Sequence, residues 1–385
     1  MSEKTILLLF GTRPEAIKLV PLIHALKAEP AFRTLVCVTA QHRQMLDQVL
    51  ATFDLHPDMD LDIMTAGQTL TDITTRTLTG LEEVLGQERP DMMVVHGDTT
   101  TTFAGALAAF YQHIPVAHVE AGLRTFRKES PFPEELNRCL TSQLADLHFA
   151  PTPLARQNLQ NERIRGEIYV TGNTVVDAFL SVQSRDVRFH DATLDALDFE
   201  GRRVLLLTCH RRENLGEHMR DIFRAVNDAV ARHGDVEVVF PVHLNPQVRQ
   251  IAQEVFGSHP RVHLVEPLEY RTFANLISRC HAVLTDSGGL QEEAPSVGKP
   301  VLVLRDTTER PEAVAAGTVL LVGTGYEAVS SHLERLLTDE AVFRRMASAV
   351  NPYGDGKACQ RIVLAMKKYF GLYDGPIPEF DEGPC

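Results

Sequence analysis

The sequence predicts two α/β domains, each organised around a doubly wound parallel β-sheet, and three observations support this fold class. The chain has 385 residues, and a single hydrophobic core usually stops growing below that length. Short apolar and β-branched runs alternate with longer helical stretches, which is the pattern of strands buried on both faces and joined by helical crossovers. The runs form two sets, one in each half of the chain, separated by a polar stretch at residues 180–200.

Each apolar run is expected to form one strand. In the first half the expected strands are Thr5–Phe10, Thr34–Thr39, Met92–His96, Val116–Glu120, Leu147–Ala150 and Glu167–Val170. In the second half they are Val204–Thr208, Val236–Phe240, Arg261–Val265, Ala282–Thr285, Val301–Leu304 and Thr318–Val322. The linker is expected near Thr171–Val182, which gives a first domain at residues 1–172 and a second at 173–358. The tail predicts a helix over Cys359–Phe370, so residues 359–385 are expected to rejoin the first domain.

Composition and charge limit the kind of protein. The formal net charge of −13 argues against nucleic-acid binding through a global basic field, but it leaves room for an anionic small substrate. No apolar run approaches a membrane span, and the N-terminal run lacks the cleavage region of a signal peptide, so a cytoplasmic protein is expected. The six cysteines include no C-x-x-C pair, which predicts reduced thiols and no metal site.

The first motif follows the first strand. Gly11 is expected to make a tight turn there, and Pro14 suits the first position of the helix that follows. Arg13 and Lys18 then lie near a helix N-terminus, which is a natural anion site, although they could equally be solvated bases. The motif matches neither the dinucleotide-binding fingerprint nor a P-loop, so neither NAD nor ATP is indicated.

Three acidic residues stand in neighbouring loops of the first domain. Asp98 and Glu120 each end a buried run, and Glu134 follows a proline-rich loop. Each has a plain structural alternative: Asp98 capping the next helix, Glu120 pairing with Arg124, and Glu134 pairing with Arg138 at i, i+4. Carboxylates that face one site push their pKa values apart, as general acid–base chemistry requires, and this favours a functional role.

Two loops of the second domain concentrate basic groups. His210 and Arg211 open the loop after its first strand, and His243 follows the next strand. A solvated basic loop is the alternative for the first, and a polar helix entry is an equal alternative for the second.

The strongest local signal is the turn Asp286-Ser287-Gly288-Gly289. A strand ends there, two glycines allow close approach of a ligand to the backbone, and the following helix N-terminus favours a diphosphate. Glu293, about one and a half turns into that helix, is placed to accept hydrogen bonds from a ribose. Arg310, after the next strand, is expected near the same crevice.

Taken in order, these motifs resemble those of the non-hydrolysing UDP-N-acetylglucosamine 2-epimerases. The matching segments, spread over residues 6–370, are GTRPEAIK, HGDTTTT, HVEAGLRT, PFPEELNR, HRREN, PVHLNP, DSGGLQEEA and TERPEA. The resemblance implies a GT-B fold with two Rossmann-like domains and a cleft between them, a homodimer, and no cofactor. It implies interconversion of UDP-GlcNAc and UDP-ManNAc, by anti elimination of UDP to 2-acetamidoglucal and re-addition, in polysaccharide biosynthesis.

The resemblance also assigns residues. Asp98, Glu120 and Glu134 match the acid–base carboxylates, with His210 as their essential partner. The UDP-sugar contacts match Arg13, Lys18, Asp98, Glu120, His210, Leu268, Phe273, Ser287, Gly288, Gly289, Glu293 and Arg310. An allosteric UDP-GlcNAc site, known in some members, matches Gln41, Gln44, Glu134, Arg211 and His243, but Gly67 stands where some relatives have Arg. The alternatives are a UDP-sugar-dependent GT-B glycosyltransferase and a 2-epimerase of a modified UDP-HexNAc.

Overall fold

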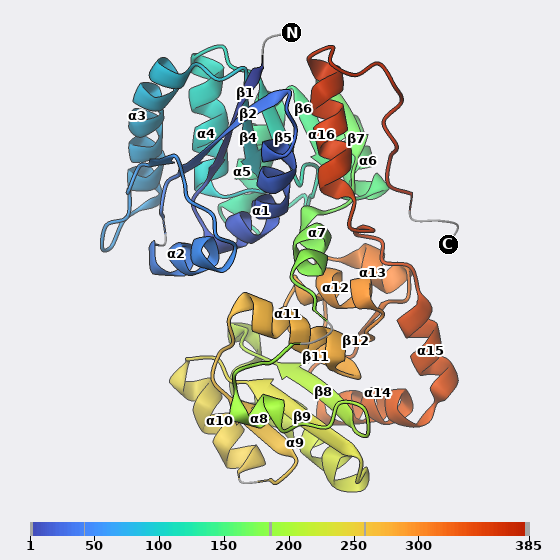
Figure 1. The fold of residues 1–385 in the computed structure, drawn as a ribbon. Coiled ribbons are helices and arrows are strands. Elements are labelled where there is room, and N and C mark those ends of the chain that lie inside the picture. The colour runs from blue at the N-terminus through green and yellow to red at the C-terminus, as the bar shows by residue number, and fades with distance from the viewer. Residues whose placement is uncertain (1–2, 42, 185–186, 258, 382–385) are drawn as a thin grey trace. The chain divides into compact units, whose positions relative to one another are not determined.

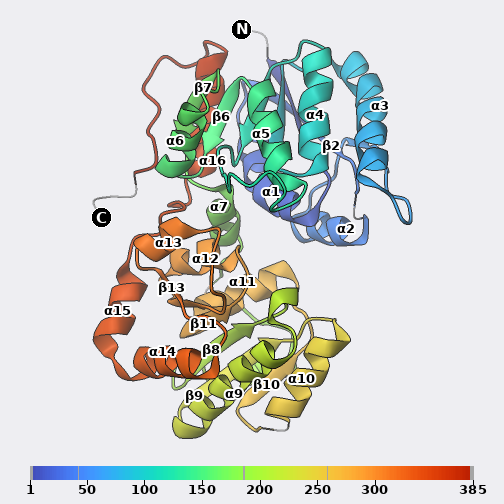
Figure 2. The same cartoon turned by 180° about the vertical axis from the view of Figure 1, so that it is seen from behind.

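The computed structural model describes residues 3–381, except residues 42, 185–186 and 258 and the side chains of residues 44 and 45. The chain forms two compact units, seen from one side in Figure 1 and from behind in Figure 2: unit 1 contains residues 3–181 and 353–381, and unit 2 contains residues 182–352. The chain leaves unit 1 after Ser181, later than the expected residue 172, because helix α7 (Thr174–Ser181) packs on helix α1 (Arg13–Lys27). It returns at Tyr353, whose carbonyl accepts a hydrogen bond from Asn173 N at 2.6 Å.

Unit 1 is built on a seven-stranded parallel sheet with the order β3-β2-β1-β4-β5-β6-β7. Its strands are β1 (Lys4–Phe10), β2 (Phe32–Val38), β3 (Met59–Asp60), β4 (Met92–His96), β5 (Val116–Val119), β6 (Leu147–Ala150) and β7 (Glu167–Val170). The other helices are α2 (Arg43–Thr52), α3 (Leu70–Glu88), α4 (Thr100–Tyr111), α5 (Glu134–Leu144), α6 (Pro153–Asn161) and α16 (Ala358–Tyr369). The six expected strands and the C-terminal helix are present, and β3 is an additional short edge strand.

Both faces of this sheet are buried, which explains the continuous apolar runs. Leu8 points into the core that α1 and α16 cover, whereas Leu7 and Leu9 point into the core beneath α3 and α4. The red helix α16 lies beside the early strands and helices in Figure 1, although it is far away in the sequence. Asp177 on α7 holds the start of α16, since its carboxylate accepts hydrogen bonds from the backbone N–H groups of residues 358 and 359 at 3.2 and 2.9 Å.

Unit 2 contains a six-stranded parallel sheet with the order β10-β9-β8-β11-β12-β13. Its strands are β8 (Arg203–Thr208), β9 (Val236–Pro241), β10 (Val262–Val265), β11 (Ala282–Thr285), β12 (Val301–Val303) and β13 (Val319–Leu321). Its helices are α8 (Ala192–Asp195), α9 (Glu217–Arg232), α10 (Pro246–Phe256), α11 (Tyr270–Arg279), α12 (Leu290–Glu293), α13 (Pro311–Ala315), α14 (Tyr326–Thr338) and α15 (Glu340–Ser348), with 3-10 turns at Arg212–Asn214 and Ala294–Val297. All six expected strands of this half are present.

The strand orders locate the functional loops. In unit 1 the chain runs outward in opposite directions from the neighbours β1 and β4, and in unit 2 it does so from β8 and β11. In open parallel sheets, ligands bind at the carboxyl ends of the two strands where this reversal occurs. The loops after β1, β4, β8 and β11 are therefore the places to look for a site.

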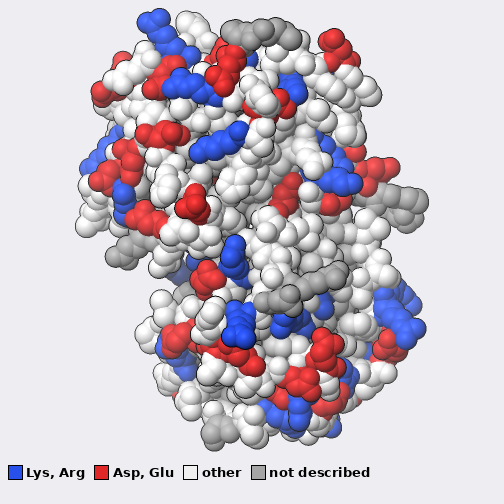
Figure 3. Space-filling view, viewed as in Figure 1, with Lys and Arg blue, Asp and Glu red and all other residues white. Residues whose placement is uncertain are grey.

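The surface agrees with the charge balance of the sequence. On the face shown in Figure 3, basic and acidic side chains are interspersed over the described residues. Within the described part of the chain, no helix is long and apolar enough to cross a bilayer.

Candidate active site

In unit 1 a buried glutamate ties together the loops after β1 and β4. Glu15, which is 2% exposed, accepts hydrogen bonds from Gly11 N at 3.1 Å and Thr12 N at 2.8 Å. Its other oxygen accepts from the hydroxyls of Thr99 at 2.7 Å and Thr102 at 3.1 Å. Burial raises the pKa of Glu15, and these hydrogen bonds oppose that rise. Glu15 thus fixes the geometry of both loops at the strand reversal.

The β1–α1 loop has room for glycine alone at its first position. A Cβ at residue 11 would lie 2.1 Å from the Thr39 hydroxyl oxygen and 2.6 Å from that of Thr101. Helix α1 begins at Arg13, so Pro14 occupies its second position and not the expected first one. The Arg13 side chain is exposed at this helix N-terminus, where it is accessible to an anion.

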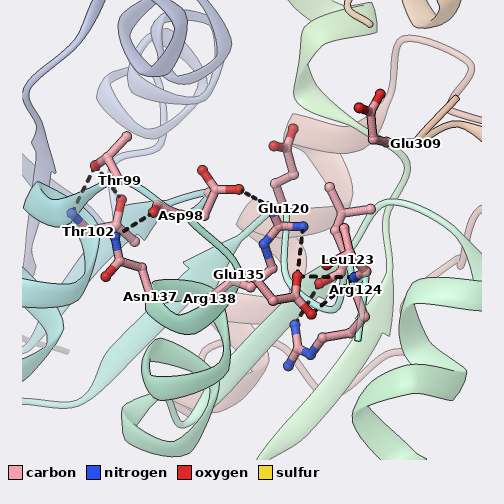
Figure 4. A network of polar contacts seen from close by, with 12 residues as sticks. Asp98, Thr99, Thr102, Glu120, Leu123, Arg124, Glu135, Asn137, Arg138 and Glu309 are labelled. Carbon is pink, nitrogen blue, oxygen red and sulfur yellow. Dashed lines mark hydrogen bonds and ion pairs between the residues drawn. The ribbon is translucent and has the colours of Figure 1, made fainter. Parts of the chain in front are cut away.

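Asp98 directly follows Gly97, which has a φ of 67°. Its carboxylate accepts a hydrogen bond from Arg138 Nη2 at 2.7 Å, and its carbonyl accepts one from Asn137 Nδ2 at 3.0 Å (Figure 4). The helix-capping alternative for Asp98 is wrong, because the Thr99 hydroxyl caps α4 by accepting from the N–H of residue 102 at 3.1 Å. A neighbouring threonine already supplies the cap, so the Asp98 side chain is left to face the arginine.

Burial raises the pKa of the Asp98 carboxyl. The cations Arg138 and Lys18 lower it, whereas the carboxylates of Glu120 and Glu134 raise it. The net direction is upward. The two glutamates singled out from the sequence therefore both act electrostatically on Asp98.

Glu120 follows β5 with a φ of 63°, a left-handed conformation that costs energy for a residue with a Cβ. Its Oε2 atom forms an ion pair with Lys18 Nζ and accepts a hydrogen bond from Asn173 Nδ2 at 2.9 Å. The Glu120–Arg124 alternative is wrong, since Arg124 forms a bidentate pair with Glu162 at 2.8 and 2.9 Å. Lys18 thus contacts a catalytic candidate and is not a solvated base.

Glu134 begins α5, and the alternative of an i, i+4 ion pair with Arg138 is wrong. Arg138 turns instead to Asp98 and lies 3.6 Å from Glu135. Glu135 is buried and accepts hydrogen bonds from the backbone N–H groups of Thr125 at 3.0 Å and of residue 126 at 2.8 Å. Glu135 therefore holds the preceding loop, and Glu134 remains half-buried at the start of the helix.

His96, Arg138 and Asn173 contact these carboxylates, and the sequence did not single them out as site residues. His96 lies with Nε2 3.8 Å from Glu120 Oε2, and both of its ring nitrogens lack hydrogen-bond partners among the described residues. Burial lowers the pKa of His96 to about 4, so the imidazole is neutral. Asn173 directly follows Gly172, which has a φ of 82°, and this glycine is the one sequence signal that could have drawn attention to it.

In unit 2 a buried aspartate organises the loop after β8. Asp286 is 0% exposed, and its Oδ2 atom accepts hydrogen bonds from His210 N and Arg211 N, each at 2.8 Å, and from Asn214 Nδ2 at 3.0 Å. His210 Nδ1 lies 3.3 Å from the other oxygen, Oδ1. A buried carboxylate therefore holds this loop in place, and the alternative of a freely solvated basic loop is wrong.

The turn after β11 leaves its backbone open. A Cβ added at Gly288 or Gly289 would meet nothing within 4 Å, so a ligand has room to approach these residues. Helix α12 spans only Leu290–Glu293, which places Glu293 at the end of one turn and not one and a half turns in. Glu293 is 9% exposed and accepts a hydrogen bond from Tyr270 Oη at 3.4 Å.

The remaining predicted contacts of unit 2 lie around α11 and α13. Leu268 precedes α11 and Phe273 lies in its first turns, and both side chains are half-buried. Arg310 stands at the start of α13, where its Nε donates to the buried carboxylate of Glu292. These residues lie at the same sheet edge as the turn.

The candidate effector residues are divided between the two units. In unit 1 the Gln41 carbonyl accepts a hydrogen bond from Gln68 Nε2 at 3.2 Å, and the Gln44 side chain lies outside the described residues. In unit 2 the His243 ring stacks on the His210 ring with centroids 5.4 Å apart, and Arg211 Nη1 lies 3.9 Å from Glu309. Burial lowers the pKa of His243, and His210 lowers it further.

Unit 1 thus contains a group of neighbouring carboxylates, and unit 2 contains a glycine-rich turn whose backbone a ligand can approach. Comparison with known proteins gives the family. The sequence profile of UDP-N-acetylglucosamine 2-epimerase matches residues 24–367, and the chain belongs to this family of isomerases. The predicted family and the GT-B-like fold class are confirmed.

Individual relatives match over nearly the whole chain. The UDP-N-acetylglucosamine 2-epimerase of Bacillus subtilis (strain 168) is 54% identical over 372 residues, which cover 96% of this chain and 97% of the relative. A crystal structure of a UDP-N-acetylglucosamine 2-epimerase is 50% identical with a TM-score of 0.91, covering 99% of this chain and 100% of the other. The UDP-GlcNAc 2-epimerase of Neisseria meningitidis, solved bound to UDP-GlcNAc, is 48% identical with a TM-score of 0.83, covering 94% and 100%.

Proposed function

We propose that this chain interconverts UDP-GlcNAc and UDP-ManNAc without a redox cofactor. The observation that carries the proposal is the group of three carboxylates in unit 1, because burial and the neighbouring carboxylates of Glu120 and Glu134 together raise the pKa of Asp98. Inversion at C2 requires one group that removes a proton and another that returns it to the opposite face. A group of neighbouring carboxylates, one of which has a raised pKa, is suited to that requirement.

The proposed reaction begins with elimination. A carboxylate removes the C2 proton, the C2–H electrons form the C1–C2 double bond, and the C1–O electrons leave with UDP, which gives 2-acetamidoglucal. UDP then re-adds at C1 while a proton is returned to C2 from the other side. Lys18 and Asn173 donate to Glu120 and so support its charged form, whereas the raised pKa of Asp98 helps it to hold a proton.

Unit 2 is proposed to hold UDP throughout this sequence. The Ser287–Gly289 turn and the N-terminus of α12 would bind the diphosphate, with Arg310 as a cationic partner. His210 would contact the UDP-sugar as the essential partner of the acid–base carboxylates. Leu268 and Phe273 would contact the uracil, and Glu293 the ribose. Arg13 at the N-terminus of α1 is proposed as a further anion contact.

The experiment is a ¹H NMR time course of UDP-GlcNAc with the purified chain in D₂O and no acceptor. UDP-ManNAc that carries deuterium at C2 is expected, with Asp98→Asn as an inactive control. Unlabelled UDP-ManNAc would contradict elimination. Free UDP with free sugar would indicate hydrolysis, and an unchanged substrate would favour a glycosyltransferase.

We also propose that the enzyme works as a homodimer in the cytoplasm and supplies UDP-ManNAc for polysaccharide biosynthesis. The five described cysteines are free thiols, and Cys139 among them is only partly buried, which suits a reducing compartment. Light scattering of the purified chain tests the dimer. Gln41, Gln44, Glu134, Arg211 and His243 remain proposed contacts of an activating UDP-GlcNAc, which sigmoidal dependence of the rate on UDP-GlcNAc would support.

A further inference from the structure

We propose that Asp286 is a positioning residue that orients the His210 imidazole and fixes which of its nitrogens faces the substrate. This inference rests on the proposed function, in which His210 is an essential partner of the reaction. It assigns to Asp286 a role separate from the diphosphate-binding backbone of the turn in which it lies. His210 touches the substrate in this scheme, and Asp286 acts only through His210.

The two oxygens of Asp286 have different surroundings. Oδ2 accepts from three donors: the backbone N–H groups of His210 and Arg211 and the side-chain amide of Asn214. Oδ1 is buried and has no hydrogen-bond partner among the described residues, and His210 Nδ1 lies 3.3 Å from it. A carboxylate can only accept, so a hydrogen bond at this position requires the proton to reside on Nδ1.

The consequence is a defined tautomer. With Nδ1–H directed at Asp286, Nε2 is the nitrogen that remains for the substrate. The same carboxylate accepts hydrogen bonds from the backbone N–H groups of residues 210 and 211. One buried group therefore positions the main chain of His210 and orients its ring. A carboxylate that fixes the tautomer and orientation of a catalytic imidazole is an established device in enzymes.

Other charged and titratable groups surround the pair. The His243 ring stacks on His210 at 5.4 Å with an interplanar angle of 13°, and Arg211 follows it in the chain with Glu309 at 3.9 Å from Arg211 Nη1. The Cys209 thiol also contacts Asp286, and burial, with the charge of Asp286, holds its pKa well above the ordinary value. The thiol is therefore neutral, and the Asp286 carboxyl group is the acceptor that lies nearest His210 Nδ1.

The test is Asp286→Asn. The amide oxygen is expected to replace Oδ2, because three N–H donors converge there, so the NH₂ group would face His210 Nδ1 and force the proton onto Nε2. We expect kcat to fall by about 100-fold or more with KM for UDP-GlcNAc changed by less than about threefold. The ¹⁵N shifts of His210, assigned with His210→Gln, should show the change from the Nδ1–H to the Nε2–H tautomer.

Asn214→Ala is the matched control. It removes one donor from Oδ2 and leaves the carboxylate in front of His210. It should lower the melting temperature but keep the tautomer and keep kcat within about threefold. An unchanged tautomer in Asp286→Asn, an unchanged kcat, or an equal loss of kcat in Asn214→Ala would overturn the proposal. The tautomer is read without turnover, so a failure of the epimerase assignment would be seen separately, as absence of UDP-ManNAc from the unmodified enzyme.

Discussion

The ion pair between Lys18 and Glu120 provides a test that separates stability from catalysis. Glu120→Gln keeps the shape and the oxygen that accepts from Asn173 but removes the charge opposite the ammonium. The side chains of Lys18 and Glu120 are 17% and 8% exposed, so the largely buried ammonium would face a neutral amide in place of the Glu120 carboxylate. Breaking such a pair costs about 3–5 kcal/mol, and the residual exposure of Lys18 favours the lower end, about 3 kcal/mol.

Thermal unfolding followed by circular dichroism measures this cost. About 3 kcal/mol corresponds to a decrease in melting temperature of about 6–12 °C for a unit of this size. Turnover should fall by about 10²–10⁴-fold, as expected when an acid–base group is removed. Adding Lys18→Met to Glu120→Gln removes the ammonium that lost its Glu120 charge, and it should restore stability to within about 1 kcal/mol of the original without restoring turnover.

A surface pair serves as the control. Arg33 and Glu88 form an ion pair with side chains 49% and 30% exposed, so Arg33→Gln should cost less than about 1 kcal/mol and leave turnover unchanged. If the double variant stays as unstable as Glu120→Gln alone, the buried ammonium is not the source of the loss. If Glu120→Gln keeps a near-normal rate, Glu120 is not an acid–base group.

Three further predictions concern the loops. Burial lowers the pKa of His96 from 6.5 to about 4. Between these two pH values the unfolded chain binds a proton that the folded chain does not bind, so the free energy of unfolding decreases as the pH falls. His96→Asn should remove up to about 3 kcal/mol of this pH-dependent loss of stability, measured by urea unfolding above pH 6.5 and near pH 4. If the variant and the original chain show the same pH dependence, His96 is not its source. Gly11→Ala should lower the free energy of unfolding by about 1–3 kcal/mol, because its Cβ would lie 2.1 Å from a threonine oxygen. Gly288→Ala should leave the melting temperature unchanged and weaken UDP binding about tenfold by calorimetry. Equal melting temperatures for the two variants would contradict this difference in packing. Thr99→Val should cost about 1–2 kcal/mol by thermal unfolding, since Thr99 caps α4 and donates to Glu15, and an unchanged stability would exclude the cap.

Most of the fold was predictable because burial on both faces leaves a clear mark on a strand. Leu7, Leu8 and Leu9 alternate between two cores, so the whole run must be apolar and is visible in the sequence. The edge strand β3 (Met59–Asp60) was missed because it has two residues and one sheet partner, β2, and so has no apolar run. The end of each run was enough to locate the loops that carry the site.

The partners of the site residues were not predictable from local spacing. Arg138 is four residues from Glu134, yet it pairs with Asp98, 40 positions away in the sequence. Arg124 likewise pairs with Glu162, 38 positions away, and leaves Glu120 to Lys18. Exposed i, i+4 pairs stabilise a helix only slightly, whereas a carboxylate at a buried sheet edge requires a partner, so the tertiary contact prevails.

The two units use buried carboxylates for the same purpose at their strand reversals. Glu15 accepts four hydrogen bonds that join the loops after β1 and β4, and Asp286 accepts three that join the loops after β8 and β11. A carboxylate whose oxygens accept from several backbone, hydroxyl and amide donors is already occupied and is therefore less available to a substrate. Asp98 instead accepts from one arginine at its side chain, and burial together with the neighbouring carboxylates raises its pKa, which leaves it suited to proton transfer. The number and kind of donors therefore distinguish the acids that build the site from the acids proposed to react in it.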